Sequence, residues 1–244
     1  MNRKRPVEQK TKGKRKRRPE ESVAEKLARE LSEREKLLSN WVPKTSLGKT
    51  VQAGTITTMD EIFDQGLKIK EPEIVDALLT LSEEVVATAK TTRVVRAGRK
   101  YSFRVTVLIG NKDGYIGVGI GKDVDRFPAI TKAKRSARLN LVKVYRGSGS
   151  WEEQPTEDKH SIPYKVEGKA GSVRVTLMPA PKGNGLAVGS NIRKVMEFAG
   201  VQNVRGKARG NSGNKLNFVK AAVDALAKTA EVKVTNDIER KLTK

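Results

Sequence analysis

The sequence predicts an α+β fold in two halves, and three features support that prediction. Residues 101–109 alternate apolar and polar side chains with the period of a half-buried strand. Residues 130–144 place apolar side chains at helical spacing on one face and basic side chains on another. The run Gly147-Ser148-Gly149-Ser150 then interrupts the composition, and strand and helix patterns resume beyond it. The second half is therefore also predicted as α+β, mostly in two layers.

The first half is predicted to run from a basic N-terminal segment into this strand and helix. Residues 19–39 are rich in helix formers and predict a helix, while residues 45–69 are predicted to be irregular with one helical turn at 60–63. Pro72 suits the first turn of a helix, which we expect to continue through Leu81. The chain is then expected to become extended and to form a cationic loop over Lys90–Lys100.

Turn chemistry and glycine spacing characterise the centre of the first half. Residues 111–114, Asn-Lys-Asp-Gly, predict a turn, and residues 115–121 predict the returning strand. Alternate glycines in that strand predict close approach of another backbone. The Walker pattern requires Ser or Thr where Asp123 stands, and the dinucleotide fingerprint requires glycine at Lys122 or Val124. We therefore reject a nucleotide-binding loop at this position.

The second half is predicted to alternate strands and helices. Residues 162–166 predict a strand, which Pro163 places at a sheet edge, and residues 173–177 predict a second strand. A shaped loop over 179–185 precedes a helix whose apolar stripe runs from Ile192 to Ala199.

The ends of that helix and the remaining elements follow from local signals. Ser190 or Asn191 is predicted to cap the helix and Gly200 to end it, after which the chain returns to the sheet. A Gly-rich basic loop is predicted over 205–215. The last helix is expected to bury Phe218, Ala222, Val223 and Leu226.

Net charge points to an anionic polymer as the partner. The 244 residues include 50 Lys and Arg against 28 Asp and Glu, a formal charge of +22. Such self-repulsion is tolerable when a polyanion neutralises it. Aromatic residues make up 5%, too few for a single-strand binder that relies on base stacking. Phosphate contact and shape are thus the expected modes of recognition, and folded RNA is the expected partner.

The same composition argues against an enzyme, a metal site and a membrane protein. The chain has no cysteine and one histidine, His160, so thiolate and multi-histidine metal sites are excluded. His160 has no evident catalytic partner and is assigned a structural hydrogen-bonding role, and no carboxylate pair sits on a recognisable catalytic frame. No apolar run reaches the roughly 20 residues of a membrane span, and the N-terminus lacks an apolar signal core. We predict a soluble intracellular protein without enzymatic activity, cofactor or metal.

RNA contacts are predicted where basic side chains gather. The first eighteen residues include ten Lys or Arg and predict an arm that lies on nucleic acid. The cationic loop and the basic helix bring two further groups into one half, which favours RNA contact over a merely solvated basic face. The predicted RNA-binding residues are Arg93, Arg96, Arg99, Lys100, Arg104, Lys122, Lys132, Lys134, Arg135, Arg138, Lys182, Arg205, Lys207 and Arg209.

Several blocks of the sequence resemble ribosomal protein five of the small subunit. Residues 96–103, Arg-Ala-Gly-Arg-Lys-Tyr-Ser-Phe, and residues 114–122 resemble its first domain. Further blocks resemble its second domain in the archaeal and eukaryotic branch, at residues 160–165, 168–174, 178–183, 198–201 and 217–221. The likeness extends in order over residues 41–229 and leaves the basic extension outside it.

The resemblance implies a domain organisation. A double-stranded-RNA-binding-like domain is expected over 41–146 and a C-terminal domain with a left-handed β-α-β unit over 147–230. They are expected between a basic N-terminal extension over 1–40 and a tail over 231–244.

The resemblance also implies a function. The chain is expected to be a structural constituent of the small ribosomal subunit in the cytoplasm, to bind small-subunit rRNA and to contribute to decoding fidelity. Its implied neighbours are ribosomal proteins four and eight, together with messenger RNA where it enters the subunit. Gly185 and Arg193 match the region that faces protein four and influences decoding accuracy, and Gly185 lies in a loop where positive φ is expected.

One departure from the family and two rival classes complete the sequence-based view. Many archaeal relatives carry cysteines between the positions of Gly147 and His160, whereas this chain has none, so no zinc site is predicted. A phosphate-dependent enzyme would rest on glycine runs whose spacing is wrong. A basic DNA-compacting protein would show no preference for folded RNA.

Overall fold

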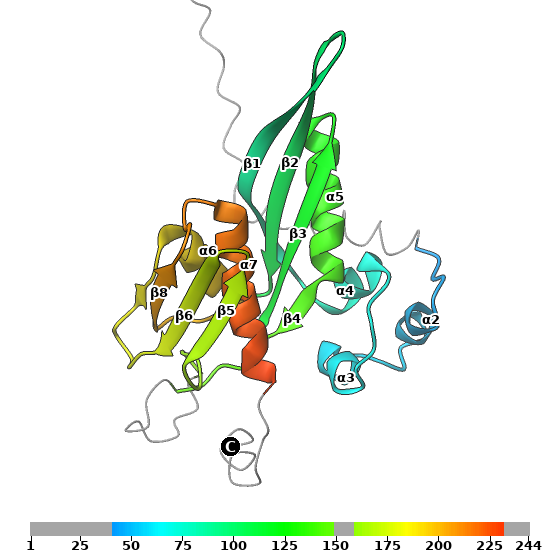
Figure 1. Ribbon diagram of the computed structural model, residues 1–244. Coiled ribbons are helices and arrows are strands. Elements are labelled where there is room, and N and C mark those ends of the chain that lie inside the picture. The colour runs from blue at the N-terminus through cyan, green and yellow to red at the C-terminus, as the bar shows by residue number, and fades with distance from the viewer. Residues whose placement is uncertain (1–40, 149–158, 232–244) are drawn as a thin grey trace, which may run out of the picture. The chain divides into compact units, whose positions relative to one another are not determined.

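Two four-stranded sheets, each accompanied by helices, make up the part of the chain that the computed structural model describes (Figure 1). Residues 41–148 and 159–231 are described, and from Val42 onward they belong to one unit. The strand orders are β1-β2-β3-β4 and β5-β6-β8-β7. The predicted α+β class is confirmed, while the predicted basic arm, the helix over 19–39 and the tail lie outside the described residues.

The first sheet is an antiparallel meander. β1 (Ser82–Val95) pairs with β2 (Gly98–Gly110), β2 with β3 (Tyr115–Asp123), and β3 with the short strand β4 (Leu141–Lys143). Between β2 and β3, the Asn111 side-chain oxygen accepts hydrogen bonds from two backbone N–H groups, at 2.8 and 3.0 Å. The strands and the turn predicted here are confirmed.

The cationic loop predicted over Lys90–Lys100 is wrong, because these residues continue the two strands. β1 and β2 remain paired up to Val95↔Gly98 and are joined by a two-residue turn. Five residue pairs extend beyond the end of β3 as a two-stranded ribbon, about 17 Å long at 3.4 Å per residue. We call this ribbon, residues 91–102, the hairpin arm (Figure 1). Its side chains are mostly exposed on both faces, so no apolar alternation predicts the strands.

Helix α5 (Arg126–Leu139) lies on one face of the first sheet, and glycines set its distance. A Cβ at Gly117, Gly119 or Gly121 would lie 2.1 to 2.5 Å from a backbone oxygen of the helix. Only glycine allows such an approach, so the predicted contact with another backbone is confirmed. The helix turns small side chains to the strand, namely Ala129, Ala133 and Ala137.

Helix α5 ends earlier than predicted. Leu141 and Val144 continue the helical spacing of apolar residues, yet the helix ends at Leu139 and Leu141 begins β4. Asn140 has left the helical region, with φ −105° and ψ 43°. Both apolar side chains are buried, so burial produced the periodic pattern while pairing with β3 determined the strand.

Three short helices precede the first sheet. They are α2 (Ser46–Gln52), α3 (Met59–Asp64) and α4 (Pro72–Leu78). Each contributes buried apolar side chains, among them Leu47, Val51, Met59, Ile62, Ile74 and Val75.

The prediction of an irregular segment over 45–69 missed α2. Its N-terminus is capped by the Thr45 hydroxyl, which accepts a hydrogen bond from the Gly48 N–H at 3.1 Å. The predicted helical turn at 60–63 is confirmed as part of α3. The helix predicted through Leu81 ends three residues earlier, as α4.

The second sheet combines three antiparallel strands with one parallel pair. β5 (Val166–Ala170), β6 (Val173–Pro179) and β8 (Val204–Arg209) are antiparallel neighbours, and the two-residue β7 (Leu186–Ala187) runs parallel to β8. The strand predicted over 173–177 is confirmed, and β5 occupies an edge.

Two helices and a 3₁₀ turn accompany this sheet. α6 (Ser190–Ala199) connects β7 to β8, and α7 (Lys215–Ala227) continues into a 3₁₀ turn at Lys228–Ala230. α7 lies against β5 and β6, where a Cβ at Gly168 would stand 2.1 Å from the Ala221 carbonyl oxygen. The burial predicted on α7 is confirmed for Phe218, Ala222, Val223 and Leu226.

The basic loop predicted over 205–215 is wrong in its first part, because residues 204–209 form β8. On the face that β8 shares with the buried residues of β6, the strand presents Val204, Gly206 and Ala208. Two of these side chains are too small to produce a visible apolar alternation, so the sequence resembles a loop.

Two further boundaries differ from the prediction. The strand predicted over 162–166 begins only at Val166. The N-cap of α6 is Gly189, and neither Ser190 nor Asn191 caps the helix. The C-terminal end is as predicted, because the residue after α6 is a glycine with φ +77°.

The two sheets share one hydrophobic cluster and a backbone contact. Leu108 of β2 belongs to the same cluster as the core of the second sheet. Lys112, in the turn after β2, donates its N–H to the Phe198 carbonyl at the end of α6, at 3.0 Å. The domain limits expected from sequence, 41–146 and 147–230, stay a prediction.

Candidate RNA-binding surface

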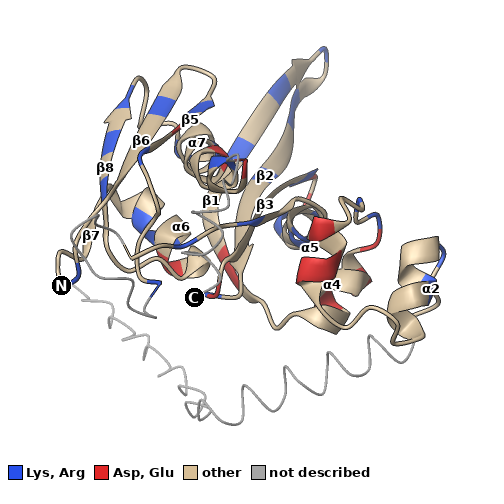
Figure 2. Cartoon of the chain, turned by 90° about the horizontal axis from the view of Figure 1, so that it is seen from below, with Lys and Arg blue, Asp and Glu red and all other residues tan. Residues whose placement is uncertain are grey.

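The hairpin arm gathers basic side chains from both strands. Residues 85–112 contain no Asp or Glu, and Figure 2 shows the Lys and Arg of this region in blue. At the base of the arm, the Lys90 ammonium lies 3.8 Å from the centre of the Tyr101 ring, a cation–π contact. The predicted RNA-binding residues that lie exposed on the arm are Arg93, Arg96, Arg99 and Lys100.

Strand register places like charges opposite each other on one face of the first sheet. Arg93 of β1 stands opposite Lys100 of β2, and nearer the core Arg104 of β2 stands opposite Lys122 of β3. Like charges directly opposite each other destabilise a sheet. None of these four side chains forms an ion pair with a residue of 41–148 or 159–231. Their charge therefore remains available to an external anion.

The basic residues of α5 are in a different situation, because carboxylates lie beside them. Lys132 is 2.7 Å from the Asp123 carboxylate. The Arg138 guanidinium lies between two acids, 2.7 Å from Asp76 and 2.8 Å from Glu83. The Arg138 side chain is 20% exposed and thus partly withdrawn from solvent.

The other two predicted residues of α5 are paired as well. Lys134 forms an ion pair with Glu83 of β1, and Arg135 lies 3.6 Å from Glu73 of α4. The Arg135 side chain is 69% exposed, so RNA could reach it without displacing buried groups. Figure 2 shows the acidic residues of α4 in red beside α5.

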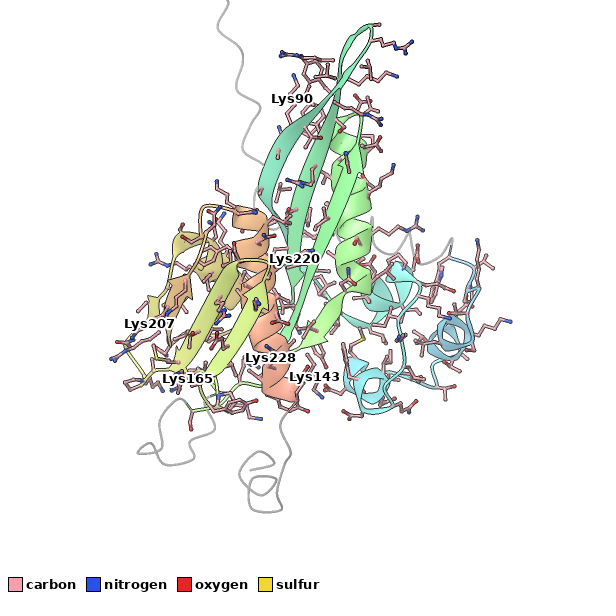
Figure 3. All side chains as sticks on the ribbon, viewed as in Figure 1. Lys90, Lys143, Lys165, Lys207, Lys220 and Lys228 are labelled. Carbon is pink, nitrogen blue, oxygen red and sulfur yellow. The ribbon has the colours of Figure 1, made fainter. Side chains whose placement is uncertain are left out.

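The predicted residues of the second half lie on the other sheet and are not brought together with the arm. Lys182 lies in the loop before β7, while Arg205, Lys207 and Arg209 lie within β8. Figure 3 shows Lys207 on the second sheet, well apart from Lys90 at the base of the hairpin arm. The Arg205 guanidinium donates to the Asn184 side-chain oxygen at 3.4 Å.

Sequence reasoning missed two exposed cations on this second sheet, Lys169 of β5 and Arg174 of β6. Arg174 occupies a polar position in the predicted strand over 173–177, so its outward direction was already visible in the sequence. Lys169 could not be placed, because β5 was predicted too early along the chain.

Gly185 and Arg193 lie on either side of the turn into α6. Gly185 has the expected positive φ, +65°, and its N–H donates to the Asn203 side-chain oxygen at 2.9 Å. A Cβ at Gly185 would meet no atom within 4 Å, so backbone conformation rather than crowding favours glycine there. Arg193 is exposed, away from the buried stripe of α6, as predicted.

His160 has the structural role that the sequence suggested. Its ring is buried, and the Asn203 side-chain amide donates to the His160 Nδ1 at 3.0 Å. The His160 carbonyl accepts hydrogen bonds from the N–H groups of Gln202 and Asn203, at 2.9 and 3.1 Å. These bonds hold the segment that leads into β8.

A polar cluster joins the short helices to the first sheet. The Tyr115 hydroxyl donates to the Asp60 carboxylate, and the Lys143 ammonium lies 2.6 Å from the same carboxylate. Burial and the hydrogen bond to Asp60 raise the pKa of Tyr115 well above its usual range. Burial acts to raise the pKa of Asp60 too, but hydrogen bonds from Lys143 and Tyr115 outweigh it and lower that pKa. The cluster is a structural contact, not a reactive centre.

Neither a metal site nor a membrane span is found in the described ranges. Residues 41–148 and 159–231 bring together no three acidic or histidine side chains that could hold a metal ion. Within these ranges, every helix is too short or too polar to cross a bilayer. Most of the stretch between Gly147 and His160, where the absence of a zinc site was predicted, lies outside the described residues.

Fold and surface define a strongly basic protein built on two sheets, with cationic strand faces that lack acidic partners in the described structure. Family models identify both halves: ribosomal protein S5, N-terminal domain, matches residues 81–145, and ribosomal protein S5, C-terminal domain, matches residues 168–241. The chain therefore belongs to the ribosomal protein S5 family, and the resemblance seen in the sequence is confirmed.

Archaeal relatives support the same assignment. The small ribosomal subunit protein uS5 of Methanothrix thermoacetophila is 47% identical over 194 residues, 79% of this chain and 95% of the relative. The uS5 proteins of Methanothermobacter thermautotrophicus and Pyrobaculum calidifontis are 46% and 48% identical, over 81% and 79% of this chain and 92% and 95% of the relatives. The chain is thus a structural, non-enzymatic constituent of the small ribosomal subunit, and the rival enzyme class is excluded.

Proposed function

We propose that this protein binds small-subunit rRNA through the hairpin arm and the adjoining strand face. The observation that carries the proposal is the pair of like-charged cross-strand contacts, Arg93 with Lys100 and Arg104 with Lys122. Without carboxylates in the described structure to offset them, these pairs disfavour the free protein. RNA phosphates would relieve the repulsion between these cations, and binding would also release counterions from the RNA. Both effects favour RNA binding.

The remaining predicted cations differ in how available their charge is to RNA. Arg135 and Lys132 are largely exposed and can exchange their carboxylates for phosphates. Arg138 is the weakest candidate, because its guanidinium is held by two acids. The other residues included are Arg96, Arg99, Lys134, Lys182, Arg205, Lys207 and Arg209.

Element order supports the finer description of the two domains. Helix α4, the antiparallel strands β1, β2 and β3, and helix α5 follow one another as in a double-stranded-RNA-binding domain. The parallel strands β7 and β8 with α6 between them form a β-α-β unit, for which we propose the left-handed crossover of the family.

A second part of the proposal concerns decoding. We assign Gly185 and Arg193 to a contact with ribosomal protein four that adjusts decoding fidelity, since Arg193 is exposed and the Gly185 loop is held by Asn203. Ribosomal protein eight and messenger RNA at the place where it enters the subunit are further proposed neighbours. The protein would act in the cytoplasm, within ribosomes.

The test of RNA binding neutralises one cross-strand pair in the full chain. Arg93→Gln/Lys100→Gln should weaken binding to small-subunit rRNA and reduce the slope of log affinity against log salt by about 1.8, because two phosphate contacts are lost. Lys68→Gln/Lys70→Gln removes the same charge from exposed residues between α3 and α4 and should leave the slope unchanged. Equal slopes for the two variants would refute the proposed arm contact.

The same assay separates this proposal from a DNA-compacting protein. Duplex DNA of equal length, added as a competitor, should displace the rRNA poorly if the protein recognises folded RNA. Equal competition by DNA would favour the compacting role.

A further inference from the structure

The second sheet has one covered face and one open face. Val173, Val175 and Leu177 of β6 are buried toward the helices, and the residues between them point to the opposite side. α7 covers the buried face closely, as the 2.1 Å approach at Gly168 shows. The open face is therefore not an unfinished core, because its positions on β6 are Arg174 and Thr176, with Met178 the one apolar side chain among them.

Register aligns three cations in one row across the open face, and two more lie along β8. Lys169 of β5 stands opposite Arg174 of β6, which stands opposite Arg209 of β8. Lys207 lies two residues before Arg209 on β8 and stands opposite Thr176, and Arg205 lies two residues before Lys207. We call this surface the open sheet face. Neighbouring strands lie about 4.8 Å apart and residues two positions apart on one strand about 6.8 Å apart, so the cations form a compact grid.

The cations of the open sheet face outnumber its acids by five to one in the described structure. Its cations Lys169, Arg174, Arg205, Lys207 and Arg209 share the face with a single acid, Glu167, which faces Thr176. Across the described residues none of these cations takes part in an ion pair. A row of three adjacent like charges is unfavourable in an isolated sheet and becomes favourable when an anion covers it.

The chemistry of the face selects the kind of anion. Residues 166–170, 173–179 and 204–209 include no aromatic residue, so base stacking has no support there. Arg side chains bind phosphate in a bidentate manner, and the Thr176 hydroxyl is a further donor suited to phosphate oxygens. An extended, flat grid of cations matches the backbone of a polymer better than a single small anion.

We propose that the open sheet face of β5, β6 and β8 binds the sugar-phosphate backbone of RNA, as a second surface separate from the hairpin arm. This inference rests on the proposed binding of small-subunit rRNA and adds Lys169 and Arg174 to the residues that take part. Recognition there follows charge and backbone shape, not base identity.

The test removes the centre of the grid from the full-length protein. Arg174→Gln/Arg209→Gln should lower the affinity for small-subunit rRNA about 30-fold at 0.15 M salt, since two lost phosphate contacts change the log–log slope by about 1.8 and the difference disappears near 1 M. Lys215→Gln/Lys220→Gln removes the same charge from exposed positions of α7 and should bind as the wild type does. Arg174→Lys/Arg209→Lys keeps the charge but loses the bidentate geometry, so its affinity should lie between those of the wild type and the glutamine variant.

Two readouts keep the outcome decisive. The glutamine variant should melt at or above the wild-type temperature in low salt, because repulsion within the row is relieved; a lower melting temperature would indicate a structural role and overturn the proposal. The glutamine variant of Arg174 and Arg209 could bind RNA as tightly as the wild type while Arg93→Gln/Lys100→Gln binds more weakly. That result would overturn the second RNA-binding surface and leave the proposed function intact. The same result with loss of another ribosomal protein from the subunit would assign the face to a protein partner. Full binding by both variants would refute both proposals.

Discussion

At Gly119, the absence of a side chain determines how closely α5 lies on the first sheet. A Cβ there would stand 2.1 Å from the Ala133 carbonyl oxygen and 2.2 Å from the Ala137 nitrogen, both helix backbone atoms that cannot move alone. Gly119→Ala should therefore lower the free energy of unfolding by about 3 kcal/mol, through overpacking. Urea unfolding of the full chain measures the loss.

The control for this prediction is a glycine with space around it. At Gly213, the nearest neighbour of an added Cβ is the Asn211 side-chain oxygen at 3.3 Å, which can turn away. Gly213→Ala should change stability by no more than about 0.5 kcal/mol. Similar losses at both positions would contradict the view that glycine sets the distance between helix and sheet.

Tyr115 provides a second test at the scale of one residue, through pH. Its pKa is raised in the folded state, so its contribution to stability is complete below about pH 10, the usual tyrosine value, and is lost as pH rises toward the raised pKa. Wild-type stability should fall above pH 10 by up to about 1.4 kcal/mol per pH unit more steeply than that of Tyr115→Phe. Chemical unfolding at pH 9, 10 and 11 measures the two slopes, and parallel slopes would contradict the prediction.

Asp60 gives the opposite sign at acid pH. Its folded pKa is lowered, so its contribution to stability is present above the usual aspartate pKa and is lost as pH falls below about 4.

The close approach at Gly119 could be predicted from the sequence, because alternate glycines in a strand are a local signal. The contact of Tyr115 with Asp60 could not, since it joins residues 55 positions apart through tertiary packing.

At the scale of elements, the sequence predicted strands and helices where one face is buried and failed where that condition does not hold. The alternation over 101–109 located β2 because Val105, Val107 and Ile109 enter the core. The hairpin arm, exposed on both faces, carries no such pattern, and neither does β8, which has only Gly206 and Ala208 beside Val204 on the face that it shares with the buried residues of β6. Most predicted RNA-binding residues were nevertheless found exposed, because charge is visible in the sequence whatever element bears it. The ion pairs that some of them form could not be predicted from the sequence.

Those ion pairs give a prediction for the packing of α4, α5 and β1. Arg138→Gln leaves Asp76 and Glu83 without the guanidinium that now lies 2.7 and 2.8 Å away. These side chains are 20 to 26% exposed, so removing the guanidinium that joins the two acids should lower the free energy of unfolding by about 2 kcal/mol. Arg135→Gln, at an exposed pair 3.6 Å long, should lower it by less than about 0.5 kcal/mol. Urea unfolding ranks the two variants, and the reverse order would show that Arg138 is free for RNA.

At the scale of the whole described unit, α6 is fixed to the first sheet by backbone hydrogen bonds at its end and by an ion pair. Its end accepts the Lys112 N–H at Phe198, and Lys194 forms an ion pair with Glu84 of β1. β1 continues into the hairpin arm, so the proposed RNA-binding arm and the proposed fidelity surface of α6 are parts of one connected framework. The two proposed surfaces are therefore joined by direct contacts between α6 and the first sheet.

This connection makes Arg193→Glu an informative change in assembled subunits. Arg193 is exposed and its neighbour Lys194 keeps the ion pair with Glu84, so the variant should fold with wild-type stability. A reversed charge at the edge of a protein contact should weaken it by about 1 kcal/mol, enough to alter misreading without preventing assembly. Misreading is measured with a reporter in cells whose small subunits carry the variant, and Lys220→Glu, at an exposed position of α7, serves as the matched charge reversal. If subunits contain Arg193→Glu in normal amounts and misread at the wild-type rate, the proposed role of α6 in decoding is wrong, because the contact proposed there would then have no effect on misreading.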